Sequence, residues 1–336
     1  FLSGLILSLY AGPIHALPHE ELISGNTMGT AYHIKVVLTG KQNLPDLEKK
    51  IEKRLEAINR SMSTFRPESE ISRFNRWNQL LEAFPISEDF FQVMTVSRYI
   101  YDLTQGAWDG TVKPLVELWG FGKSVEGRSV PEKSRIEEVR NGIGFHHIRI
   151  LKNKRLLKES QDVTLDLASI AKGYGVDAVS ELLRKEGLSR FLVEIGGEVY
   201  ASGAKADGNP WRVGINYPDP AASLTRVHKI VLLKDMALAT SGDYRNFFEI
   251  DGIRYSHVID PKTGWPVSNG VISVSVWAKT CTLADGLATA MMVMGAEKGV
   301  ALANRLDSVE CLIIRRAVKD RFVESYSHGF DQIISR

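Results

Sequence analysis

The sequence predicts an α+β fold in which mixed or antiparallel sheets pack against helices. Its 336 residues are 44% hydrophobic and 24% charged, as in a folded globular protein with one large domain or two intimately joined subdomains. Segments with strand and helix patterns are interleaved without a regular βαβ period. In the second half, turn residues separate a series of short strands, which favours antiparallel pairing.

The first third of the chain carries the patterns of one strand and two amphipathic helices. A turn over residues 24–30 leads into a strand over residues 31–38, where β-branched and aromatic side chains alternate with polar ones. Apolar residues recur at helical spacing over residues 44–62 and again over residues 89–103. Residues 106–115 combine turn formers with an aromatic side chain, an acid and a hydroxyl, so they predict a loop that lines a cleft.

Two adjacent histidines, His146 and His147, follow a short charged helix that is predicted over residues 131–140. Gly142 and Gly144 return the chain to a strand at this point. Neighbouring side chains on a strand point to opposite faces, so the two imidazoles cannot easily bind one metal ion. The pattern therefore favours a structural role for this pair over metal ligation.

The rest of the chain predicts mainly antiparallel strands, with three helices among them. Within residues 163–186 a strand becomes a helix, and a hairpin turned at Gly196 and Gly197 follows over residues 191–203. The remaining predicted strands cover residues 211–215, 227–233, 236–240, 244–250, 271–277 and 309–314, with one more in the tail, and the remaining helices cover residues 280–292 and 296–306.

Charge and cysteine usage argue against two classes of protein. A formal charge of +2, from 42 basic and 40 acidic residues, gives no field of one sign over the molecule, so we expect no nucleic-acid partner. Cys281 and Cys311 lie in unlike surroundings, without a CxxC motif or a Cys/His cluster. Neither a zinc site nor a disulfide framework is supported, although one disulfide between these two residues remains open.

The N-terminal residues 1–17 hold an apolar run, broken by Gly and Pro, that resembles the core and cleavage region of a secretory signal. The run is too short to span a bilayer comfortably, and it has no cysteine for a lipoprotein anchor. We therefore expect an exported, periplasmic protein, free or attached to the outer face of the inner membrane, whose folded part covers residues 24–336. The alternative is that residues 1–17 belong to the core.

The helix predicted over residues 280–292 carries two hard oxygen ligands. Asp285 and Thr289 are four residues apart, so a carboxylate and a hydroxyl project from one face about one turn apart. The other faces are apolar, which directs the two polar groups into the protein and predicts a cation site. The alternative is that Thr289 bonds back to its own helix and Asp285 is a surface or first-turn acid.

The transition from strand to helix near residue 168 places an acid, backbone amides and a lysine at the start of a helix. Such an end attracts phosphate, and Lys172 adds a full charge. The glycines of a P-loop are absent from this stretch. In the alternative interpretation, Asp166 only caps the helix and Lys172 is solvated.

Five stretches together resemble the ApbE family of FAD:protein FMN transferases, and the likeness extends from about residue 24 to the C-terminus. Each is a weak signal alone, whereas all five in family order are highly specific. The resemblance implies an ApbE-like architecture related to the T-fold. The stretches are Thr27 to Thr30, Asp109 with Thr111 to Leu115, Asp166 to Tyr174, Ser256 to Gly264, and Ala284 to Thr289.

The resemblance also implies an activity and a set of site residues. Members of the family use Mg²⁺ to transfer the FMN half of FAD to a threonine hydroxyl of a flavoprotein, with release of AMP. Asp285, Thr289 and the backbone carbonyl of Ser169 would hold the Mg²⁺ ion, and His257 would be the catalytic base, with Asp260 placed to orient its ring. The residues that match FAD contacts are Met28, Phe65, Ala107, Trp108, Asp109, Asp166, Lys172 and Ile259.

The resemblance further implies acceptors among the flavin-carrying subunits of membrane redox complexes, such as sodium- or proton-coupled NADH or ferredoxin oxidoreductases. Gly110, Lys113 and Phe65 depart from residues frequent in the family, and these departures bear on FAD affinity more than on reaction type.

Two rival functions use parts of the same site. One is an FAD pyrophosphatase that releases FMN and AMP, and the other is a non-catalytic periplasmic flavin-binding protein.

Overall fold

The computed structural model describes residues 17–40, 43–122, 129–219, 226–243, 246–317 and 321–334. The predicted secretory segment therefore lies almost wholly outside the described residues. At the centre is an eight-stranded sheet in which every neighbouring pair is antiparallel, which confirms the α+β class. In spatial order its strands are β1 (His19–Thr27), β2 (Thr30–Leu38), β6 (Phe191–Ile195), β7 (Glu198–Ser202), β10 (Met236–Gly242), β13 (Val271–Ala278), β14 (Glu310–Arg316) and β15 (Phe322–Tyr326).

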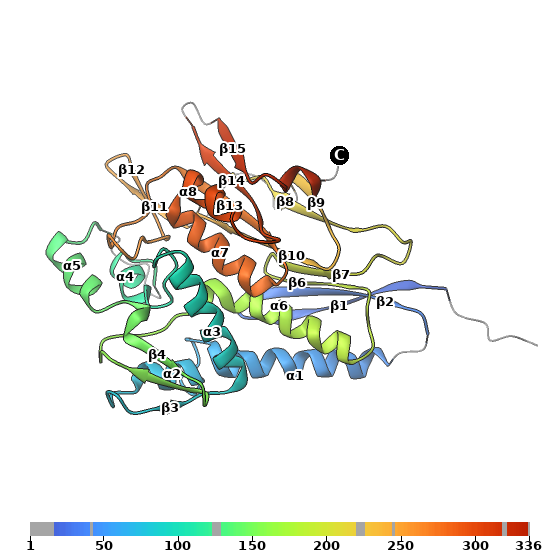
Figure 1. The fold of residues 1–336 in the computed structure, drawn as a ribbon, viewed down its shortest axis with the longest axis horizontal. Coiled ribbons are helices and arrows are strands. Elements are labelled where there is room, and N and C mark those ends of the chain that lie inside the picture. The colour runs from blue at the N-terminus through green and yellow to red at the C-terminus, as the bar shows by residue number, and fades with distance from the viewer. Residues whose placement is uncertain are drawn as a thin grey trace, which may run out of the picture.

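Helices cover one face of this sheet. Helices α6 (Ala168–Lys185) and α7 (Cys281–Met294) lie side by side against the strands, and α1 (Leu44–Met62) and α3 (Glu88–Leu103) pack beyond them (Figure 1). The short α8 (Ala296–Ala303) packs on β14. Apolar side chains of alternate strand residues meet these helices in the main core, which includes Ile34, Val193 and Val274.

The other face of the sheet packs against a hairpin of β8 (Trp211–Asn216) and β9 (Val227–Leu233). The opposite set of alternate residues, such as Val199 and Leu238, contributes to this second apolar cluster, which also contains Trp211 and Val231. The central strands of the sheet are therefore buried on both faces, and this explains why several of them read as nearly continuous apolar runs.

Smaller elements surround one end of the molecule. A three-stranded sheet of β3 (Phe84–Pro85), β5 (Arg155–Lys158) and β4 (Ile148–Leu151) lies near α2 (Glu70–Arg76) in Figure 1. Helices α4 (Lys113–Leu118) and α5 (Lys133–Asn141) form the left edge of that view, below the hairpin of β11 (Phe247–Ile250) and β12 (Ile253–Ser256).

Four local predictions are wrong. The strand predicted at the start of residues 163–186 is absent, because residues 163–167 have no regular secondary structure and lead directly into α6. Most of the turn predicted over residues 24–30 is strand β1, and the turn itself is confined to Met28 and Gly29, which have φ values of 50° and 75°. The end of the predicted loop is helix α4, which has Pro114 in its first turn. The histidine pair lies in a short 3-10 helix (Phe145–His147) instead of a strand, and its ring centroids are 4.1 Å apart, so the opposite-face argument does not apply to it.

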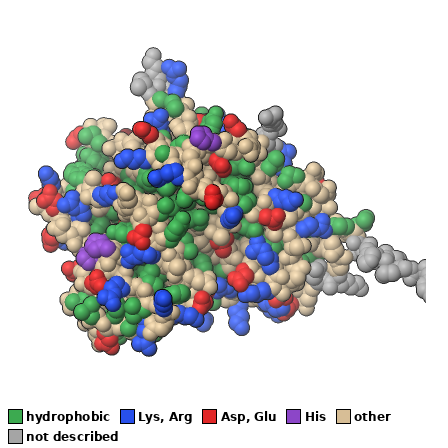
Figure 2. Space-filling model, viewed as in Figure 1, with side chains coloured by type: hydrophobic (Ala, Val, Ile, Leu, Met, Phe, Trp, Pro, Cys, Tyr) green, Lys and Arg blue, Asp and Glu red, His purple; other side chains and the backbone are tan. Residues whose placement is uncertain are grey.

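Several chemical features complete the description of the fold. Cys281 and Cys311 are both buried free thiols, so they do not form the disulfide that the sequence left open. Within the described residues, no helix is long and apolar enough to cross a membrane. On the face shown in Figure 2, Lys and Arg side chains are interspersed with Asp and Glu, in line with the balanced composition.

One buried cation makes the stability depend on pH. The side chain of Lys158, at the end of β5, is 1% exposed, donates to the carbonyl of Asn75 at 3.1 Å and lies over the ring of Phe74. Burial lowers the pKa of Lys158 to about 8 from an ordinary value of 10.5. Between these values the unfolded chain binds more protons at this residue than the folded chain does.

We predict that the stability of the protein relative to its Lys158→Met variant rises between about pH 8 and pH 10.5. Below pH 8 the parent bears the full cost of the buried charge, and above pH 10.5 the amine is neutral in both states. Denaturant titrations of both proteins across this pH range measure the difference in unfolding free energy. Lys152→Met, at an exposed position, serves as the control, and a difference that does not change with pH would refute the assignment.

Candidate functional site

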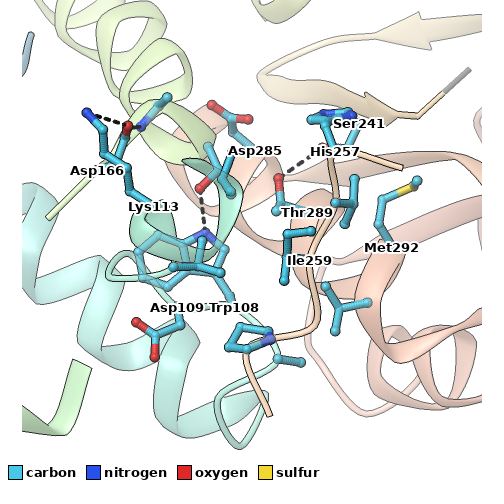
Figure 3. Close-up of a pocket in the computed structure, with 18 of the residues that line it drawn as sticks. Trp108, Asp109, Lys113, Asp166, Ser241, His257, Ile259, Asp285, Thr289 and Met292 are labelled. Carbon is cyan, nitrogen blue, oxygen red and sulfur yellow. Dashed lines mark hydrogen bonds and ion pairs between the residues drawn. The ribbon is translucent and has the colours of Figure 1, made fainter. Parts of the chain in front are cut away.

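A cavity of about 380 Å³ lies where the first turn of α6, the middle of α7 and two loops converge. Trp108 and Asp109 come from the chain between α3 and α4, and His257 and Ile259 come from the segment after β12 (Figure 3). Further lining residues are Ala107, Lys113, Asp166, Ser169, Lys172, Glu198, Ser241, Asp285 and Thr289. The structure thus gathers ten of the twelve site residues inferred from the sequence around one cavity.

The other two, Met28 and Phe65, line a second cavity of about 770 Å³ between the β1–β2 turn and the end of α1. Phe65 is 76% exposed, at its rim. Both cavities are lined by Asp166, Ala168 and Lys172. They therefore meet at the start of α6, and together they can hold an elongated ligand that has a polar group near its middle.

Close packing of α6 on α7 places Asp285 in the wall of the first cavity. Asp285 is 2% exposed, and its Oδ2 accepts a hydrogen bond from the backbone N–H of Gly173 at 2.9 Å. A Cβ atom at residue 173 would come within 2.4 Å of the Cys281 carbonyl oxygen, so only glycine permits this approach. The interpretation of Asp285 as a surface or first-turn acid is wrong.

Thr289 lies one helical turn further along α7. Its Oγ1 is 3.1 Å from Oγ of Ser241 on β10, so the hydroxyl is paired with the neighbouring strand, in contrast to the back-bonded alternative. In Figure 3 the Thr289 side chain lies between Asp285 and His257. The expected pairing of a carboxylate and a hydroxyl on one helix face is present.

The oxygens near Asp285 suit a hard divalent cation. Ser169 lines the same cavity, and its hydroxyl accepts a hydrogen bond from the indole N–H of Trp108 at 3.0 Å. In a regular helix the N–H of Gly173 would donate to the carbonyl of Ser169, but here that N–H also serves Asp285. A carboxylate, a hydroxyl and a backbone carbonyl together form an all-oxygen set that fits Mg²⁺.

Within the described part of the chain, no group of three or more His, Cys, Asp or Glu side chains could hold a metal ion. A Mg²⁺ site does not require one, because this ion commonly uses one or two carboxylates and completes its shell with water and substrate phosphates.

Lys172 is paired with Glu198, a residue that the sequence analysis missed. The Lys172 Nζ lies 2.6 Å from Glu198 Oε1, so the interpretation of Lys172 as a solvated side chain is wrong. Burial alone would lower the pKa of Lys172, but the nearby carboxylates of Asp285 and Glu198 outweigh it and raise the pKa. Burial, assisted by Asp285, also raises the pKa of Glu198, while Lys172 opposes this shift. The signal available in the sequence was an acid directly after the Gly196–Gly197 turn, at the start of the otherwise uncharged Val199–Ser202 run.

Asp166 and Asp109 organise the local backbone. Asp166 Oδ1 accepts from the N–H of Ala168 at 2.9 Å, but the N-cap residue of α6 is Leu167 and has no side-chain cap, so the capping interpretation is wrong. Asp166 Oδ2 lies 3.6 Å from Lys113 Nζ. The Asp109 carboxylate accepts from the N–H and hydroxyl of Thr111 and from the N–H of Phe145. In Figure 3 it points away from Asp285 and Thr289, so this carboxylate shapes the loop.

His257 has one ring nitrogen fixed by the backbone. Its Nδ1 lies 3.1 Å from the carbonyl oxygen of Asn246. A carbonyl only accepts, so Nδ1 carries the proton and Nε2 of the neutral ring keeps its lone pair. Burial lowers the pKa of His257, although this hydrogen bond opposes the shift. Asp260 does not orient the ring as expected, because its Oδ1 accepts from the N–H of Lys262 in the next turn.

The glycine contact between α6 and α7 predicts a steric effect. We expect Gly173→Ala to lower the free energy of unfolding by about 1–3 kcal/mol, because the new methyl group meets the backbone of Cys281. Gly175→Ala in the same helix is the matched control, since its methyl group would meet mainly the flexible end of Met28. Equal stabilities of the two variants in denaturant titrations would contradict the steric argument.

Comparison with known proteins finds extensive similarity. The model of the ApbE family matches residues 28–313. The FAD:protein FMN transferase of Vibrio cholerae serotype O1 is 42% identical over 321 residues, which are 95% of this chain and 94% of that protein. The solved structure of the flavin transferase ApbE from Vibrio cholerae has a TM-score of 0.85 at 40% identity and covers 94% of this chain and 99% of that one. The flavinyl transferase ApbE of Pseudomonas stutzeri, in its apo form, has a TM-score of 0.84 at 37% identity, with coverages of 95% and 98%.

Proposed function

The chain belongs to the ApbE family, and we propose that this FAD:protein FMN transferase uses Mg²⁺ to move the FMN half of FAD onto a threonine hydroxyl, with release of AMP. One observation carries the proposal. A hard-oxygen pair, a cation and an imidazole with a free Nε2 come from distant parts of the chain to the wall of one cavity. Phosphoryl transfer depends mainly on such positioning and charge stabilisation.

The two connected cavities suit a dinucleotide. FAD has a ring system at each end and a doubly charged pyrophosphate between them. The pyrophosphate would lie where the cavities meet, near Lys172 and the first backbone N–H groups of α6. The ring systems would then occupy one cavity each, with Met28 and Phe65 in the larger cavity and Trp108 and Ile259 in the smaller one.

Asp285, Thr289 and the carbonyl of Ser169 would hold the Mg²⁺ ion. When bound, the ion supplies positive charge that stabilises the transferring phosphoryl group and the departing AMP. Gly173 contributes through its N–H, which orients the Asp285 carboxylate toward the cavity. The hydroxyl of Ser241 orients the hydroxyl of Thr289 in the same way.

His257 would act on the incoming threonine. The threonine Oγ forms a bond to the phosphorus of the FMN half while the bond from that phosphorus to the oxygen of the AMP phosphate breaks. The hydroxyl proton passes to Nε2 of His257, which the hydrogen bond at Nδ1 keeps in the accepting tautomer. Because the pKa of His257 lies below its ordinary value of 6.5, the ring is neutral and ready to accept a proton at neutral pH.

We further propose that the acceptor is a flavin-carrying subunit of a membrane redox complex and that transfer takes place on the outer face of the inner membrane. The apolar segment at residues 1–17 supports export. The names of the relatives support a protein acceptor.

The metal assignment predicts that Asp285→Asn raises the Mg²⁺ concentration needed for half-maximal transfer by at least about tenfold, since it removes the charged ligand. The assay follows the gain of FMN mass on an acceptor domain that carries a single target threonine. Asp102→Asn, at a largely exposed position on α3, is the charge-matched control. An unchanged Mg²⁺ requirement would refute the assignment of Asp285 as a metal ligand.

The base assignment predicts that His257→Ala binds FAD nearly as well as the parent but transfers FMN about 10² to 10⁴ times more slowly. In the parent, the rate should rise with pH through a pKa below 6.5 and then level off, because only the neutral ring accepts the proton. In the variant this rise of the rate with pH should disappear, and added imidazole should restore part of the rate. Full transfer by the variant would show that the ring is structural.

An acceptor with valine in place of threonine separates transfer from hydrolysis to FMN and AMP.

A further inference from the structure

Glu198 has no role in the transfer derived above, although it lines the same cavity. It is 3% exposed, and one oxygen, Oε1, is paired with Lys172 Nζ at 2.6 Å. The other oxygen, Oε2, is buried and has no hydrogen-bond partner among the described residues. Burying a carboxylate in this way is costly, so the residue requires an explanation.

The turn between β6 and β7 delivers Glu198 to Lys172. Gly196 and Gly197 both have positive φ values, 60° and 99°, and the chain therefore reverses within two residues. A Cβ atom at residue 196 would lie 3.3 Å from Cδ of Lys172, so the stem of the lysine runs directly along this turn. The ammonium group is thus held by the hairpin, at the point where the two cavities meet.

The Asp285 carboxylate lines the same cavity as Lys172 and Glu198, and it also attracts the ammonium group. The two acids compete for one flexible cation. Both are buried, and attraction between opposite charges is stronger there than in bulk water. An ammonium group resting on Asp285 would occupy the oxygen atoms that a divalent cation needs. The contact with Glu198 prevents this, because it holds the Lys172 ammonium group 2.6 Å from a different carboxylate of the same cavity.

We propose that Glu198 is a positioning residue that holds the Lys172 ammonium away from Asp285 and so keeps Asp285 free for the metal ion. The inference rests on the proposed metal site and deepens it. Glu198 makes Lys172 available to the phosphates without letting it compete with the cation. Two other roles make different predictions: Glu198 could be a metal ligand itself, or it could act only through its negative field.

A double-mutant cycle with Mn²⁺ as the probe separates these roles. Binding of Mn²⁺ to the FAD-free protein is measured by electron paramagnetic resonance for the parent, Glu198→Gln, Lys172→Met and the double variant. We expect Glu198→Gln to weaken Mn²⁺ binding by about tenfold to a hundredfold when Lys172 is present. In combination with Lys172→Met, the same change should have a much smaller effect, because the competing ammonium group is gone.

Equal losses in the two backgrounds would show that only the field of Glu198 matters, and a larger loss in the double variant would show direct ligation. Either result overturns the positioning role of Glu198 but leaves the proposed metal site unaffected. A parent protein that binds no Mn²⁺ would instead overturn the metal site and the inference together. Glu181→Gln, which removes an exposed carboxylate paired with Lys185 outside both cavities, is the charge-matched control and should bind Mn²⁺ like the parent.

A crystal structure of metal-free Glu198→Gln gives a second, direct readout. We expect Lys172 Nζ to lie within hydrogen-bond distance of the Asp285 carboxylate in this variant. A lysine that stays on the substituted side chain would overturn the proposed competition. Thermal unfolding of all four proteins verifies that each is folded, so a loss of Mn²⁺ binding cannot be assigned to misfolding.

Discussion

The close packing of α6 on α7 is the interaction on which the rest of the site depends. It requires Gly173, because a side chain at that position would collide with the backbone of Cys281. Asp177 on α6 fixes the register of the two helices, since its carboxylate accepts from the N–H groups of Cys281 and Thr282, both at 2.8 Å. The half-buried Asp177 and the buried Asp285 thus bind α6 and α7 to each other through backbone donors. These contacts place the start of α6 beside the middle of α7.

The charges around the first cavity form a compact set in which each group depends on the others. Lys172 lies near two acids, and its own attraction to Glu198 offsets part of the cost of burying that carboxylate. His257, by contrast, has no carboxylate partner in the described residues, and the carbonyl of Asn246 sets its tautomer. Burial lowers the pKa of His257, and a neutral carbonyl opposes this shift less than a carboxylate would, so the ring is neutral at neutral pH.

Periodicity identified the elements whose burial follows one simple pattern. Helix α1 begins and ends at the predicted residues 44 and 62, because one apolar stripe faces the core and its other faces are polar. The hairpin turned at Gly196 and Gly197 is also confirmed, because these positions need positive φ values. The failures lie where tertiary contacts override local signals. Strand β1 was missed because its side chains are largely exposed and its order comes from pairing with β2.

By itself, the sequence determined the family, the α+β class and the residue types of the site, because five short motifs in order and the apolar periodicities are local properties of the chain. It determined that Asp285 and Thr289 share one helix face, since a 3.6-residue period suffices for that. Only the tertiary structure decided that Glu198 holds Lys172 and that Asn246, not Asp260, orients His257. These contacts join residues brought together by strand pairing and helix packing, and the energies that select them are electrostatic and depend on burial. No pattern within a short segment specifies which carboxylate lies closest to a given cation.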